Sequence, residues 1–157
     1  MDTTIEVRVI GVVGQQGGSS IRVAEEYRAG LIGLSDFSHA MVLWAFDRAR
    51  WDGKTLVMPP AYRRLDREIG TFATRTPLRP SPIAVSVSRI LSVDLEEGTI
   101  LLDWIDAEDR SPVIDIKPYH PSEDRIRDVA MPAWCAHWPS CREESADFDW
   151  GSEFTFS

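Results

Sequence analysis

The segment 72–84 (Phe-Ala-Thr-Arg-Thr-Pro-Leu-Arg-Pro-Ser-Pro-Ile-Ala) constrains the fold more than any other part of this chain, because it contains three prolines. Proline fixes φ at about −65° and pushes the preceding residue toward extended geometry. The segment therefore predicts a stiff, non-helical loop that holds Arg75 and Arg79 in place. Arginines held in this way lose little entropy on binding a carboxylate or a phosphate. A plain proline-rich surface connection has the same composition. The neighbouring motifs are therefore needed to distinguish a binding loop from such a connection.

Two further motifs accompany this segment, Gly-Leu-Ser-Asp-Phe-Ser-His at 33–39 and Asp-Arg-Ser-Pro-Val-Ile-Asp-Ile-Lys-Pro-Tyr at 109–119. In order and spacing the three motifs resemble the TsaA-like, or TrmO, family, over roughly residues 10–119. The family comprises β-barrel methyltransferases that use S-adenosylmethionine, and its characterised members methylate a threonylcarbamoyl-adenosine beside the tRNA anticodon. The resemblance implies this cofactor, a tRNA partner and a homodimer.

Length and composition predict one domain over residues 1–157, because 157 residues of which 43% are hydrophobic suffice for a single core. Its tail, from about residue 130 to 157, is rich in aromatic residues. No stretch approaches the ~20 apolar residues needed to span a bilayer, and the start lacks the pattern of a secretory leader. Two cysteines fit a reducing compartment. We expect a cytoplasmic protein that does not bind membranes.

The net charge of −8 argues against bulk electrostatic binding of nucleic acid. Any RNA contact therefore has to be local. The middle of the chain is rich in arginine, whereas residues 143–153 are mainly acidic. A basic patch with an acidic tail is one interpretation, and solvated faces are the other.

The hydrophobic pattern predicts a mainly β fold. Residues 5–13, 37–46, 85–93 and 99–105 have strand patterns, and 24–34 has the spacing of one short helix. Serine alternates with valine along 85–93, which predicts one wet face. Strands joined by short turns indicate an antiparallel barrel or sandwich. With the resemblance, we expect a small antiparallel β-barrel with one or two short helices and a single domain.

A site for S-adenosylmethionine needs a carboxylate for the ribose diol or the amine, and an apolar slot for the adenine. Arg75 is suited to bind the methionine carboxylate in a bidentate manner. Strand-end capping is the alternative role for Asp103 and Asp106. By resemblance, the cofactor contacts are Gln15, Gln16, Gly17, Phe46, Asp47, Arg75, Val85, Asp103, Trp104, Ile105 and Asp106.

Methyl transfer to a weakly acidic N–H requires a base, and Asp115 between two isoleucines is the best candidate. Burial there is expected to make its carboxylate more basic. Strand periodicity places Lys117 and Tyr119 on the same face, so we assign all three as catalytic. A structural ion pair with a tyrosine hydrogen bond is the alternative. Arg79 and His39 are assigned to substrate binding, although a structural role is open for His39.

The chain departs from the family pattern on the acceptor side. Leu78, Ser81 and Ala84 stand where relatives usually have histidine, asparagine and glycine, and Asp-Arg-Ser at 109–111 stands where they usually have Asp-Gly-Thr. Such changes would alter which acceptor is bound more readily than they would alter cofactor binding. A small-molecule acceptor is therefore the second hypothesis, and a non-catalytic module that binds an adenosine-like ligand is the third.

The tail holds Cys135, His137 and Cys141, whose spacing matches no strong zinc motif. We therefore predict no metal site. Its aromatic residues supply apolar area that anchors the tail on the barrel or on a second subunit, or stack on a flat substrate. They are Trp134, Trp138, Trp150, Phe154 and Phe156.

Overall fold

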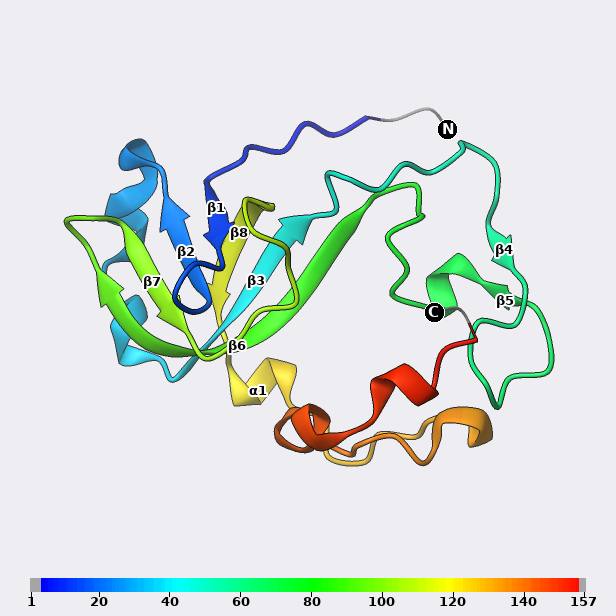
Figure 1. Ribbon diagram of the computed structural model, residues 1–157. Coiled ribbons are helices and arrows are strands. Elements are labelled where there is room, and N and C mark those ends of the chain that lie inside the picture. Colours follow the sequence, from blue (N-terminus) through cyan, green and yellow to red (C-terminus); the bar gives the residue numbers. More distant parts are fainter. Residues whose placement is uncertain (1–3, 156–157) are drawn as a thin grey trace. The chain divides into compact units, whose positions relative to one another are not determined.

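A closed antiparallel β-barrel forms the larger part of the protein in its computed structural model, which describes residues 4–155. Contacts divide the chain into two compact units. The first contains the residues up to Arg50 together with Pro80–Arg125, and the second contains Trp51–Arg79 and the residues from Ile126 onward. Each unit is described by itself (Figure 1).

The barrel strands follow the order β1-β2-β7-β6-β3-β8, and every neighbouring pair is antiparallel. The mainly β class and the small barrel expected from the sequence are confirmed. Closure leaves no unpaired sheet edge along these strands. The strands are β1 (Gly11–Gly14), β2 (Ser20–Val23), β3 (His39–Ala45), β6 (Ile83–Asp94), β7 (Thr99–Leu102) and β8 (Pro112–Pro118).

Strand β3 lies between β6 and β8, within the segment 37–46 that was predicted as a strand. Its alternate residues Ala40, Val42 and Trp44 are buried in the barrel interior, at 0%, 0% and 4% exposure. The residues between them face outward with partial exposure. Alternation along β3 therefore separates a dry interior from an outer surface that is free to carry function.

Strand β6 has one wet face, but the serines are not on it where they were expected. Ser86 and Ser88 are 8% and 0% exposed, whereas Val85 is 45% exposed. The reason is space and hydrogen bonding: the bulky Trp44 fills the interior, and its indole Nε1 donates to Ser86 Oγ at 3.0 Å. A small hydroxyl residue thus fits where a valine would crowd the ring.

Two expected elements differ in the structure. The strand predicted from residue 5 begins at Gly11, and Ile5 is 80% exposed because its segment has no strand partner. The single helix predicted over 24–34 is two 3₁₀ segments, Glu25–Leu31 and Leu34–Asp36. Gly33 separates them with φ of 83°, a left-handed conformation that ends a helix.

The barrel unit also contains a tight turn between β6 and β7 and a short helix after β8. The turn between β6 and β7 uses Gly98 at φ of 66°, and β7 ends at Leu102, earlier than the predicted residue 105. The α-helix α1 (Pro121–Asp124), the only α-helix within residues 4–155, is one turn long and follows β8.

The second unit is held together by aromatic contacts. Tyr62 stacks on Trp134 with 4.8 Å between ring centroids, and Tyr62 forms an isolated β-bridge with Phe154. The tail therefore packs on the 60–65 region of its own unit; Phe156 lies outside the described residues. The unit also contains β4 (Val57–Met58), β5 (Ile69–Gly70) and 3₁₀ segments Thr71–Ala73, Ala133–Cys135, Arg142–Asp147 and Trp150–Ser152. The domain limits expected over 1–157 stay a prediction.

Within residues 4–155, no helix is both long enough and apolar enough to cross a lipid bilayer.

The two inward serines of β6 give a matched test of this core. Ser86→Ala removes the partner of the Trp44 indole and should cost about 1–2 kcal/mol of unfolding free energy. Ser88 is fully buried, and its hydroxyl has no hydrogen-bond partner within residues 4–155, so Ser88→Ala should be neutral or slightly stabilising. Urea denaturation followed by circular dichroism measures both. Equal losses for the two variants would contradict the assignment of the Trp44–Ser86 bond.

Candidate functional site

Three loops meet at one end of the barrel, which we call the loop-bearing end: residues 14–20 after β1, 46–48 after β3 and 103–111 after β7. Gln15 joins the first and third loops. Its Nε2 donates to the carbonyls of Ala107 at 2.7 Å and Ile105 at 3.3 Å. Its Oε1 accepts from the Ser19 hydroxyl at 3.1 Å. The whole side-chain amide of Gln15 is therefore used to position the 105–107 backbone.

A second set of contacts fixes residues 108–109. The backbone N–H of Gln15 donates to Asp109 Oδ1 at 2.9 Å. Arg48 forms an ion pair with Glu108 and donates through Nη2 to the Asp109 carbonyl at 3.0 Å. All three loops are thus connected by polar contacts that sequence periodicity does not reveal.

Arg110 adopts a conformation that normally belongs to glycine. Its φ is 71°, and among the described residues every other positive φ belongs to a glycine. Such a conformation costs an L-residue about 1 kcal/mol or more. Its N–H donates to the Val13 carbonyl at 2.8 Å, and the Ser111 N–H donates to the backbone carbonyl of Glu108 at 3.1 Å. The surrounding turn therefore holds Arg110 in this strained geometry.

The predicted cofactor residues of 103–106 fall into two groups. Asp103 Oδ1 accepts from the backbone N–H groups of Arg89 at 2.8 Å and Trp104 at 2.7 Å, so Asp103 caps the strand ends. Ile105 is 2% exposed and packs in the core. Trp104 is 53% exposed and Asp106 is also exposed, so these two side chains are accessible to a ligand.

The other predicted cofactor residues of the barrel unit lie on the neighbouring loops and on β6. Gln16 and Gly17 form an exposed turn in which Gly17 has φ of 78°. Phe46 packs edge-on against Trp44, with ring centroids 4.7 Å apart, and Asp47 beside it is exposed.

Val85 and Asp115 occupy one row on the outer surface of the barrel. Strand register pairs Leu43 of β3 with Val85 on one side and with Asp115 on the other. Adjacent strands lie about 4.8 Å apart, so the predicted cofactor contact and the predicted base are about 10 Å apart on one face. A one-residue bulge between Leu43 and Trp44 sets this phase on β8.

Asp115 and Lys117 form an ion pair on this outer face, with Lys117 Nζ 2.6 Å from Asp115 Oδ2. The hydrogen bond from the ammonium raises the pKa of Lys117 above its usual value. The expected cause of reactivity at Asp115 was burial, but its side chain is 43% exposed and its partner is a cation. The structure thus presents a half-exposed carboxylate held by a lysine.

Tyr119 and His39 lie at the other end of the same row. Their rings meet edge to face with centroids 6.3 Å apart, and the Tyr119 N–H donates to the His39 carbonyl at 3.0 Å. His39 Nδ1 is 2.9 Å from the Ser38 hydroxyl. The row Asp115, Lys117, Tyr119 therefore ends beside a histidine.

The two arginines of the proline-rich loop belong to the second unit. Arg79 Nη2 donates to the carbonyls of Thr71 at 3.0 Å and Thr74 at 2.7 Å, so Arg79 stiffens its own loop. Arg75 is exposed and, within residues 4–155, forms no polar contact. Of the two, Arg75 has the guanidinium that is free to bind an anion.

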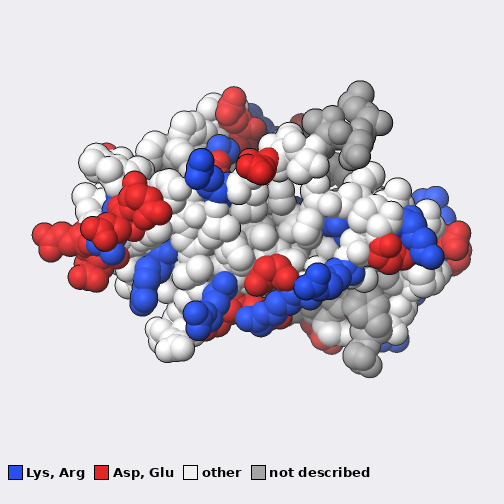
Figure 2. Space-filling view, turned by 90° about the horizontal axis from the view of Figure 1, so that it is seen from above, with Lys and Arg blue, Asp and Glu red and all other residues white. Residues whose placement is uncertain are grey.

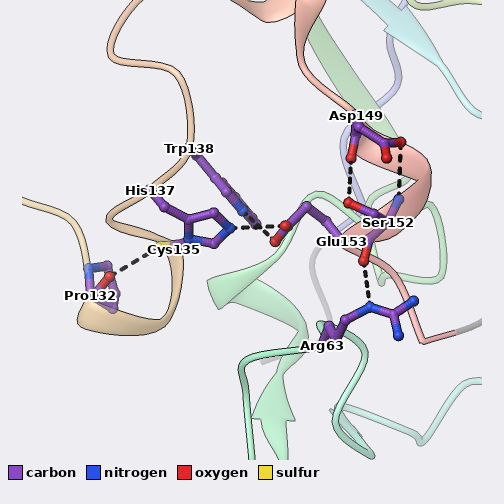
Figure 3. Close-up of polar contacts among 8 residues, drawn as sticks. All are labelled: Arg63, Pro132, Cys135, His137, Trp138, Asp149, Ser152 and Glu153. Atoms are coloured by element: carbon purple, nitrogen blue, oxygen red, sulfur yellow. Dashed lines mark hydrogen bonds and ion pairs between the residues drawn. The ribbon is translucent and has the colours of Figure 1, made fainter.

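Glu153 organises a separate polar cluster in the second unit (Figure 3). Its carboxylate lies 2.9 Å from His137 Nε2 and accepts from Trp138 Nε1 at 2.9 Å. The His137 contact is the main cause that lowers the pKa of Glu153. Cys135 donates to the Pro132 carbonyl at 3.5 Å, and burial raises the pKa of its thiol.

The three tail residues weighed as zinc ligands thus have separate surroundings, and Cys141 is exposed. Across residues 4–155, no group of three or more His, Cys, Asp and Glu side chains is arranged to hold a metal ion.

Charges of both signs are mixed on the face shown in Figure 2, where Lys and Arg side chains lie among Asp and Glu side chains.

Residues 10–125 match the family described as the tRNA-methyltransferase O N-terminal domain. The chain belongs to the tRNA-methyltransferase O family. The resemblance drawn from the sequence motifs is thereby confirmed, and the match includes the barrel and residues 51–79 of the second unit. Residues 126–155 lie outside it.

Relatives of the tRNA-methyltransferase O family include a protein of Archaeoglobus fulgidus named S-adenosyl-L-methionine-binding protein. It is 40% identical over 111 residues, which are 71% of this chain and 76% of the relative. The Escherichia coli protein named tRNA (adenine(37)-N6)-methyltransferase is 30% identical over 123 residues, which are 76% of this chain but 52% of the relative. The chain thus spans about half of that enzyme.

A solved structure shows the same fold. The crystal structure of TrmO from Pseudomonas aeruginosa matches with a TM-score of 0.64 and 26% identity, over 82% of this chain and 62% of that chain.

Sequence reasoning missed the residues that brace the loop-bearing end. Arg48, Ser19 and Asp109 were not assigned, although each is polar and adjacent to an assigned residue or motif. Gln15 was assigned to the cofactor, while its side chain is engaged with backbone 90 and 92 positions away. Adjacency to a motif was the available signal, and only the folded chain reveals the partner.

Gln15 and Gln16 offer a matched test of this bracing. Gln15→Ala removes three side-chain hydrogen bonds, so amides 105–111 should exchange with solvent at least about tenfold faster. Gln16→Ala, one residue along on the exposed turn, should leave these amides unchanged. Hydrogen–deuterium exchange with mass spectrometry measures both. Wild-type protection in Gln15→Ala would show that the loop does not depend on this side chain.

Proposed function

We propose that this protein is an S-adenosylmethionine-dependent N-methyltransferase that acts on adenosine in tRNA. The observation that carries the proposal is the family match over residues 10–125, which contains every residue assigned to the cofactor, the base and the acceptor. One relative is named for S-adenosylmethionine binding and another for tRNA adenine methylation. The finer acceptor, a threonylcarbamoyl-adenosine beside the anticodon, is part of this proposal.

The cofactor would supply an electrophilic methyl group on a sulfonium. Accessible side chains suited to hold it are those of Trp104, Asp106 and Asp47, with Gln16 and Gly17 supplying backbone contacts. Gln15, Asp103 and Ile105 act indirectly in this proposal, because they fix the backbone of the same loops. Arg75 keeps its assignment as the ligand of the methionine carboxylate.

Asp115 serves as the base in the proposed reaction. Its carboxylate would take the proton from the acceptor N–H during methyl transfer, and a sulfonium donor would need no acid, because its product is a neutral thioether. Lys117 orients the carboxylate through the 2.6 Å contact. Tyr119 and His39 orient the acceptor farther along the row. Positioning on a rigid sheet supplies most of the remaining rate enhancement.

A small-molecule acceptor is the second candidate. The observation that favours it is the net charge of −8, which opposes a polyanionic substrate. A non-catalytic adenosine-binding module is the third. Comparing methyl transfer from labelled cofactor to tRNA and to a nucleoside pool distinguishes the acceptors, and cofactor binding without any transfer would favour the module.

Two variants separate the roles of base and cofactor ligand. Asp115→Asn should keep the Kd for S-adenosylmethionine within about twofold and slow single-turnover methyl transfer by about 10²-fold or more. Arg75→Ala should raise that Kd about tenfold and retain the rate at saturation. Titration calorimetry and rapid quench measure the two quantities.

Matched controls for these variants are Asp36→Asn and Arg67→Ala, which change exposed residues outside the assigned set. Binding loss in Asp115→Asn with an intact rate would reverse the assignment. Wild-type behaviour in both variants would remove the site altogether.

The homodimer implied by the resemblance remains a prediction. Leu91 and Leu101, on β6 and β7, are 59% and 45% exposed, and with Val85 they supply apolar area that a second copy would cover. Light scattering should give twice the chain mass for the wild type and a lower mass for Leu101→Asp. A monomeric wild type at micromolar concentration would contradict the prediction. A tRNA-modifying role would agree with the cytoplasmic location expected from the sequence.

A further inference from the structure

We propose that Arg110 is a substrate-positioning residue whose guanidinium binds a phosphate of the tRNA acceptor at the loop-bearing end. This inference rests on the proposed function, which assigns tRNA as the acceptor but gives Arg110 no role.

The backbone geometry of Arg110 is the first reason. A left-handed φ of 71° is easily adopted by glycine and unfavourable for arginine. Strained residues persist where their surroundings enforce them, and they cluster at functional sites. The turn here is enforced by the bonds from Arg110 N–H to Val13 and from Ser111 N–H to Glu108. The side chain of Arg110 is consequently attached to a backbone position that is held in one conformation.

The surrounding charges are the second reason. Glu108 is paired with Arg48, and Asp109 Oδ1 accepts the Gln15 N–H, so the two neighbouring acids are already engaged. Arg110 is exposed and forms no side-chain hydrogen bond or ion pair with any residue of 4–155. Of the other two acids of this loop, Asp103 accepts backbone N–H groups and Asp106 is exposed. Arg110 is therefore an uncommitted cation on a rigid turn.

The charge of the whole protein favours a phosphate as its ligand. With 25 acidic and 17 basic residues, the protein repels RNA at long range, so binding depends on individual, well-placed cations. Arginine offers a planar fork that matches phosphate oxygens. Because Arg110 lies in the same loop as residues 103–106, a phosphate bound there would hold the acceptor nucleotide near the proposed cofactor contacts.

Arg110→Gly tests this inference without disturbing the turn, because glycine adopts the same φ freely. We expect an unchanged or higher melting temperature and an unchanged Kd for S-adenosylmethionine. The Kd for a fluorescein-labelled tRNA carrying adenosine beside its anticodon should rise about five- to tenfold at low salt. The slope of log Kd against log salt should fall by about 1, the amount that one lost phosphate contact accounts for.

Three further variants define the effect. Arg110→Asn, which also tolerates a left-handed φ, should reproduce the glycine result. Arg110→Lys should keep the salt slope and recover part of the affinity, because the charge remains but the fork is lost. Arg22→Ala removes an exposed arginine from β2 of the same unit and should change the tRNA Kd by less than about twofold.

The outcomes are distinguishable. Wild-type tRNA affinity and salt slope in both Arg110→Gly and Arg110→Asn would overturn the inference while leaving the proposed function standing. A weaker Kd for S-adenosylmethionine with unchanged tRNA binding would assign Arg110 to the cofactor and also overturn it. If the wild type binds the cofactor but no tRNA, the tRNA acceptor and this inference fail together.

Discussion

Closure of the barrel between β1 and β8 is the constraint on which the arrangement of the site depends. Gly11 pairs with Val23 of β2 on one side and with Val113 of β8 on the other. A Cβ at Gly11 would lie 2.4 Å from the carbonyl oxygen of Arg22, so this close approach requires glycine. Closure brings the loop after β1 against the loop that precedes β8. Gln15 can then reach the carbonyl of Ala107, 92 positions along the chain.

Closure also determines where chemistry can take place. The interior is filled by residues such as Val42 and Trp44, with a serine hydroxyl satisfied by the indole, and it leaves no room for a substrate. Polar residues with a proposed catalytic role therefore lie on the outer face, where Asp115 meets Lys117. There, the ion pair with Lys117 rather than burial holds the carboxylate in place.

The sequence predicted the elements that depend on local pattern and missed those that depend on distant contacts. The apolar pattern correctly indicated a strand within 37–46, and strand periodicity placed Asp115 and Lys117 on one face, because this periodicity is a property of the backbone. It could not show that the serine face of β6 is buried, since that depends on Trp44 from another strand. The predicted helix over 24–34 was wrong because Gly33 turns left-handed within it.

The use of arginine illustrates the same limit in functional terms. Arg48, Arg63 and Arg79 all donate to backbone carbonyls and therefore act as parts of the scaffold. A count of basic residues from the sequence treats these side chains as available for RNA, but a guanidinium that satisfies carbonyl groups would have to break those bonds to bind a phosphate. Within the described part of the chain, exposed arginines without such partners, Arg75 among them, are the ones that can bind an anion at little cost. In an acidic protein, any affinity for RNA then depends on a few defined contacts. That affinity should decrease less steeply with salt than the affinity of a protein that makes many phosphate contacts.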